Sequence, residues 1–161
     1  MAAEQSPQDR ARALSREMTK RASSINAIRN EHGMKVSQHV SLMSRARKIM
    51  EVLGDSDRRG QLTGNQAKQL EAELVKSYEG IYELAKWEEL AEGQITELQQ
   101  ELSGIHKDAR EIAPDLIPRS LPAHHMTKLT ALFRDSYQKL DEETDRRLGV
   151  GRAPLRVQSM G

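Results

Sequence analysis

The sequence predicts an all-α fold, an elongated helical bundle or coiled coil of four to five helices with a proline elbow and a flexible C-terminal tail. Apolar residues fall three or four positions apart, most regularly in the stretch QITELQQELSGIHKDAREI at 94–112. Only 3% of the residues are aromatic and 30% are charged, which suits long helices that bury a narrow stripe. A helix over 67–112 would be roughly 69 Å long, whereas a globule of this chain length would measure about 40 Å across.

The first helix is expected to begin at Ser6, with Pro7 at its first helical position. Apolar residues continue at helical spacing as far as Leu53. Gly33 interrupts this run, either as a C-cap or as a glycine inside one long helix, and we favour a kink or short break there. The segment GDSDRRGQL at 54–62 holds two glycines and two aspartates, which predicts a turn.

The third helix, over 67–112, has the most regular pattern. Thr63 and Gln66 have the spacing of a capping box at its start. With Ala67 as heptad position a, twelve of the fourteen a and d positions are apolar, over more heptads than a coiled coil requires. We therefore expect a seam that contacts another helix, in the same chain or in another copy, and we favour self-association of the protein through this seam. Its residues are Leu70, Leu74, Ile81, Leu84, Ile95, Leu98, Leu102, Ile105 and Ile112.

The apolar face of this helix narrows along its length. It is wide between 74 and 91, which predicts packing among several helices, and it is reduced to the a and d positions from 95 to 112, which predicts one partner helix. Gly80, Gly93 and Gly104 are the points at which the helix could instead break.

Ser77 and Glu88 are the two polar exceptions in the seam. A polar residue at such a position often fixes register or oligomeric state, and Glu88 could pair with an arginine of a neighbouring helix, such as Arg47. Alternatively, a local stutter turns Glu88 outward and Trp87 inward. We favour the stutter, because Trp87 would otherwise be exposed.

Prolines mark the end of the bundle, which we assign to 1–112. Pro114, Pro118 and Pro122 recur every four residues, which predicts an extended, semi-rigid elbow over 113–123. A last helix is expected over 124–148. The tail at 149–161 contains no acidic residue and is expected to be flexible.

The net charge of +1 conceals a division between a basic segment, 1–53, and an acidic one, 64–112. Residues 1–50 hold ten Lys and Arg against four Asp and Glu, a balance of +6, and residues 51–112 hold seven against fourteen, a balance of −7. We favour packing of the two segments against each other, within one chain or between copies.

The alternative is that the basic segment binds nucleic acid or another anionic surface. The candidate contacts are Arg10, Arg12, Arg16, Arg45, Arg47 and Lys48. The first 50 residues contain no aromatic side chain on which a base could stack, and this weakens the alternative.

Motifs of catalysis and cofactor binding are missing from the sequence. It contains no GxxxxGK[ST], GxGxxG, HExxH or GxSxG. His32 and His39 share helical spacing but have no third ligand at a matching position. Cysteine is absent, so disulfides are excluded. We therefore expect a protein that is not an enzyme and needs no cofactor or metal.

The sequence thus favours a structural or assembly protein that acts through helix–helix contacts with protein partners, as a homo-oligomer or part of a larger assembly. The alternatives are a helical nucleic-acid-binding protein and a monomeric helical chaperone or adaptor. No apolar run is long enough to span a membrane, and no secretory signal is visible. The expected location is the cytoplasm, or a particle that is assembled there.

Overall fold

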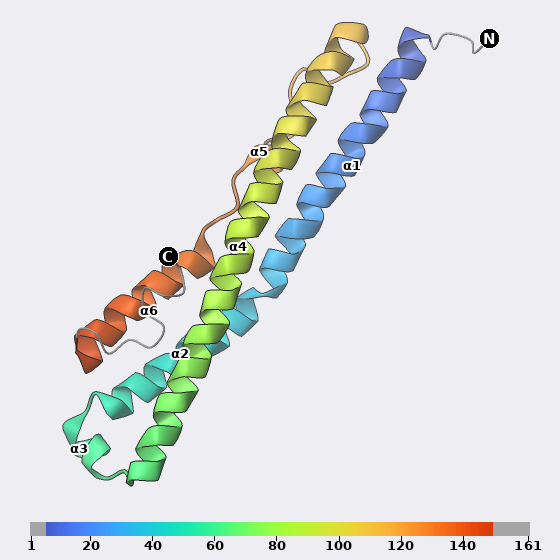
Figure 1. Ribbon diagram of the computed structural model, residues 1–161. Coiled ribbons are helices and arrows are strands. Elements are labelled where there is room, and N and C mark those ends of the chain that lie inside the picture. The colour runs from blue at the N-terminus through green and yellow to red at the C-terminus, as the bar shows by residue number, and fades with distance from the viewer. Residues whose placement is uncertain (1–5, 150–161) are drawn as a thin grey trace. The chain divides into compact units, whose positions relative to one another are not determined.

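The computed structural model describes residues 6–149, and every regular element in this range is a helix (Figure 1). The helices are α1 (Pro7–Met34), α2 (Val36–Leu53), α3 (Ser56–Gly60), α4 (Gly64–Ile112), α5 (Ala123–Met126) and α6 (Leu132–Leu148). The chain divides into two compact units. Unit 1 consists of Met1–Gly33 and Leu90–Thr130, and unit 2 consists of Met34–Glu89 and Ala131–Gly161. The helix α4 contributes to both units.

The predicted helix starts are confirmed by their capping hydrogen bonds. The Ser6 hydroxyl accepts from the backbone N–H of Asp9 at 3.1 Å. Before α4, the Thr63 hydroxyl accepts from the backbone N–H of Gln66 at 3.1 Å. The Gln66 side chain in turn accepts from the N–H of Thr63 at 2.9 Å, which completes the capping box. The predicted break near Gly33 is also present, since the helical run is interrupted at Lys35.

The helix α4 is continuous through Gly80, Gly93 and Gly104, so the alternative of a break at one of these glycines is wrong. Its 49 residues correspond to a length of about 73 Å. A Cβ atom at Gly80 would lie 2.7 Å from the Cδ1 atom of Leu42. Close packing of α2 against α4 therefore explains the glycine at position 80.

Two predicted boundaries need correction. The turn at 54–62 contains the short helix α3, because the Asp55 side chain accepts from the N–H groups of Asp57 and Arg58 and so nucleates a helical turn. The helix predicted over 124–148 is really two helices, α5 and α6, with residues 127–131 between them. Thr127 is extended there, with φ −76° and ψ 149°.

As predicted, the proline-rich segment is not helical from 113 to 122. Contrary to the prediction, it is not extended throughout. A turn closes where the N–H of Leu116 donates to the carbonyl of Ala113 at 3.0 Å. Arg110 donates to the carbonyl of Ile117 at 2.9 Å, and His106 Nε2 lies 2.8 Å from the carbonyl oxygen of Pro118. Polar side chains of α4 therefore hold this segment against the helix. Residues 150–161 of the predicted tail lie outside the described range.

Unit 1 packs α1 and the segment 113–130 against the C-terminal part of α4 (Figure 1). Ala11 and Ile25 of α1 are buried, as are Ile117 and Leu129 of the connecting segment. Arg21 of α1 forms an ion pair with Glu101 of α4 at 3.4 Å. In this unit the basic N-terminal segment thus packs against the acidic helix of the same chain.

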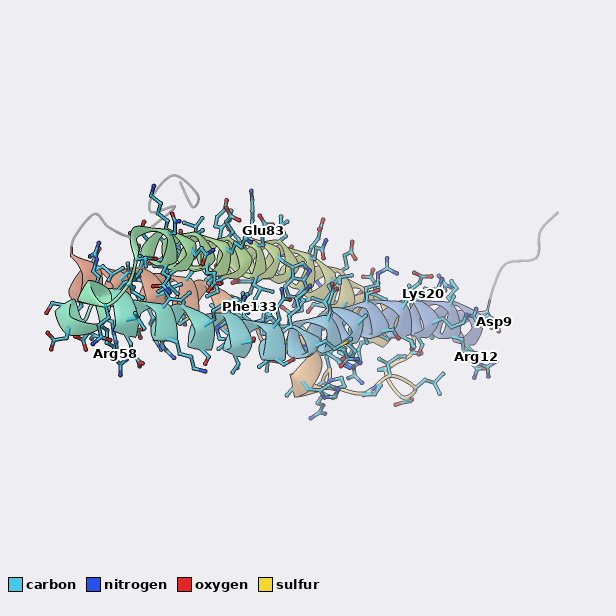
Figure 2. The ribbon with its side chains drawn as sticks, turned by 90° about the horizontal axis from the view of Figure 1, so that it is seen from below. Asp9, Arg12, Lys20, Arg58, Glu83 and Phe133 are labelled. Carbon is cyan, nitrogen blue, oxygen red and sulfur yellow. The ribbon has the colours of Figure 1, made fainter. Side chains whose placement is uncertain are left out.

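Unit 2 packs α2 and α6 against the N-terminal part of α4. Phe133 of α6 is completely buried, and Figure 2 shows it between the ribbons of α2 and α4. The Tyr78 hydroxyl donates to the carbonyl of Leu140 at 3.1 Å and also bonds the hydroxyl of Thr144. The wide apolar face predicted for 74–91 therefore contacts two other helices, whereas the face after 95 contacts one helix and the proline-rich segment.

Candidate functional site

The predicted seam of α4 is covered within the chain. Five of its residues are buried, namely Leu74, Ile81, Leu84, Ile95 and Leu102. The other four, Leu70, Leu98, Ile105 and Ile112, are half-buried. None of the fourteen a and d positions is exposed. The heptad pattern therefore identifies the face of α4 that packs against the rest of the chain.

Glu88 is buried at 0% exposure, so the stutter favoured from the sequence is wrong. Its carboxylate accepts from the backbone N–H of Phe133 at 3.0 Å and from that of Arg134 at 3.1 Å. The Arg134 guanidinium lies 3.7 Å away. Arg47, the partner suggested from the sequence, binds Glu143 instead.

Trp87 lies at the edge of the same core. It is half-buried and packs against the buried cluster of unit 2. The Nζ atom of Lys35 lies 5.0 Å from the centre of its ring, within the range of a cation–π contact. Trp87 therefore has a partner without any rotation of the heptad register.

An open groove of about 640 Å³ runs along α2 beside α4 in unit 2. It is lined by Ser37, Val40, Ser41, Ser44, Arg45, Lys48, Ile49 and Val52 of α2 and by Leu70 and Glu73 of α4. Val40, which lines this groove, is 58% exposed. We call this surface the α2 groove.

A second depression, of about 440 Å³, lies beside α6. A ridge of α2 side chains separates it from the α2 groove. Val40, Ser44 and Lys48 line both. The exposed ridge of α2 therefore stands between two grooves. This is the shape into which the side chains of another helix pack.

The six basic candidates from the sequence fall into two groups. Arg10, Arg12 and Arg16 are exposed on α1 in unit 1, and Arg45, Arg47 and Lys48 are exposed on α2 in unit 2. Arg47 makes two hydrogen bonds of 3.1 Å to Glu143, which raise the pKa of its guanidinium. Arg45 and Lys48 form no ion pair with any residue of the range 6–149.

The α2 groove was not predicted from the sequence. Its signal was present as three serines at positions 37, 41 and 44, which recur with helical spacing on one face of α2. Small side chains at such positions let another helix approach closely. The exposed valine between them could not be recognised, because its spacing also fits a buried stripe.

Within the described part of the chain, no three His, Asp or Glu side chains lie close enough to hold a metal ion. No helix among residues 6–149 is long and apolar enough to cross a membrane. No protein-family model matches the chain, and no curated protein or solved structure shows significant similarity to it.

Proposed function

We propose that this chain is a non-enzymatic structural or assembly protein that acts through helix–helix contacts with other protein chains, including copies of itself. The observation that supports this best is the α2 groove, with its exposed Val40. A groove that combines an exposed valine with half-buried apolar side chains suits the helix-in-groove mode of recognition. The cytoplasm, or a particle assembled there, is the proposed location.

Solution mass tests this function directly. We expect light scattering at low and at high salt to show a defined oligomer, and Val40→Asp to dissociate it, because a charge would then replace an apolar contact. Leu90→Asp is the matched control, since Leu90 is 66% exposed and lies in unit 1. An unchanged mass for Val40→Asp would exclude the α2 groove as the self-association surface.

Two alternative functions have a specific observation in their favour. The covered seam favours a monomeric helical chaperone or adaptor, for which the mass equals one chain at every concentration. Nucleic-acid binding is favoured by Arg45 and Lys48, which are exposed and have no ion-pair partner among residues 6–149. In that case, affinity for a DNA or RNA duplex should fall steeply with salt, and Arg45→Glu with Lys48→Glu should abolish it.

A further inference from the structure

We propose that the α2 groove binds an amphipathic helix of a partner protein whose flank is acidic. This inference rests on the proposed function, because it names the partner of the same surface. It goes further by assigning the occupant a secondary structure, a length and a charge.

The dimensions of the groove fit a helix. Its lining residues on α2 extend from Ser37 to Val52, which corresponds to roughly 24 Å, or about four helical turns. The apolar side chains that line it and keep some exposure, Val40, Val52 and Leu70, would contact a stripe of apolar residues on the occupant. The serines at 37, 41 and 44 leave room for its backbone to approach.

The charged side chains around the ridge favour an occupant helix with acidic residues on its flank. Arg45 and Lys48 line the groove beside α4, and Lys139 of α6 lines the second depression. None of these three cations forms an ion pair with a residue of the range 6–149. Carboxylates on the occupant would supply the missing partners.

Acidic residues are also present and set the orientation. Glu73 stands on the α4 side of the groove, and Glu51 lines the depression beside α6. A partner helix therefore places its carboxylates on the α2 side of the groove, near Arg45 and Lys48, and keeps them away from Glu73 on the α4 side. Like charges at that rim would oppose binding.

Two synthetic helical peptides of about four turns test the proposal with the full chain. Both have the same leucine stripe, but one has glutamates on its flanks and the other has lysines. Fluorescence anisotropy of the labelled peptides should show that the glutamate peptide binds about tenfold more tightly than the lysine peptide. The reason is that ion pairs between its glutamates and Arg45 and Lys48 would each contribute modestly to the binding free energy. Salt should reduce this difference.

Matched variants connect the preference to the groove. Arg45→Glu with Lys48→Glu should remove or reverse it, and Val40→Asp should weaken both peptides. Arg12→Glu with Arg16→Glu makes the same change of charge on exposed residues of unit 1 and should leave the preference intact. Circular dichroism of each variant verifies that it is folded.

Several outcomes overturn the inference. Equal affinity for the two peptides would overturn it. It would also be overturned if the control variant, Arg12→Glu with Arg16→Glu, lost the preference for the glutamate peptide. If only a DNA duplex binds, and Arg45→Glu with Lys48→Glu abolishes this binding, the basic face recognises phosphate. If neither peptide binds and Val40→Asp dissociates an oligomer, a second copy of the chain occupies the groove. A monomeric chain that still prefers the glutamate peptide excludes self-association and supports the inference.

Discussion

Glu88 caps a helix that has no capping side chain of its own. Ala131 stands at the N-cap of α6 and makes no side-chain hydrogen bond there. The Glu88 carboxylate accepts instead from Phe133 and Arg134, the second and third residues of that helix, which are the N–H groups an N-cap residue would satisfy. A negative charge is also stabilised at the N-terminus of a helix.

Replacement of Glu88 should therefore destabilise unit 2. We expect Glu88→Ala to lower the free energy of unfolding by about 3 kcal/mol, because the N–H groups of Phe133 and Arg134 lose their acceptor and the Arg134 guanidinium loses an ion-pair partner. Glu88→Gln keeps one acceptor oxygen and should cost about 1–2 kcal/mol. Urea unfolding followed by circular dichroism measures both. Glu89→Gln, on the exposed neighbour, is the control, and an equal effect there would contradict the capping role.

The glycines of α4 differ in what surrounds them. Outside the local backbone of α4 and the adjacent residues, no atom lies within 4 Å of the position that a Cβ atom would take at Gly104, whereas a Cβ atom at Gly80 would lie 2.7 Å from the Leu42 side chain. Gly104→Ala should therefore raise the free energy of unfolding by about 1 kcal/mol through helix propensity. Gly80→Ala should raise the free energy of unfolding by less, since the Leu42 side chain must move to make room for the added methyl group. Thermal unfolding of the two variants tests this order, and a larger gain at position 80 would refute it.

We expect the stability of unit 1 to depend on pH through His125 of α5. Burial, and then the nearby charges of His124 and Arg29, lower the pKa of His125 from its usual value of 6.5. The unfolded chain therefore binds a proton more readily than the folded one, so stability is lost as the pH falls below about 6.5. His125→Gln should reduce the loss between about pH 7.5 and about pH 5.5 in urea unfolding. An identical pH profile for the variant would contradict this.

The sequence predicted most helices because their signals are local. The capping box at Thr63 and the heptads of α4 depend on residues a few positions apart. The division between α5 and α6 was missed because the acceptor for α6 is Glu88, 45 residues before Phe133. The α2 groove was missed for a related reason. The exposure of Val40 depends on where α4 and α6 pack, and spacing within α2 does not contain that information.

The chain divides into two compact units, and the helix α4 contributes residues to both. Because most tertiary contacts lie within one unit or the other, a local defect should open only its own unit. We expect Glu88→Ala to accelerate amide hydrogen exchange in α2, α6 and the part of α4 before Leu90. The part of α4 around Leu102 should remain protected. Equal acceleration in both parts would show that the chain unfolds as a single cooperative unit.

The capping of α6 by Glu88 also bears on the order in which the helices of unit 2 pack during folding. The helices α2 and α4 are joined by a short connection through α3, so their contacts close a small loop. Glu88 can contact Phe133 only when two residues 45 positions apart have been brought together. Closing this longer loop costs more conformational entropy than closing the connection between α2 and α4, so we expect it to be slower. We therefore expect α2 to pair with α4 before α6 docks, so that the apolar side chains that pack against α6 stay exposed until it docks.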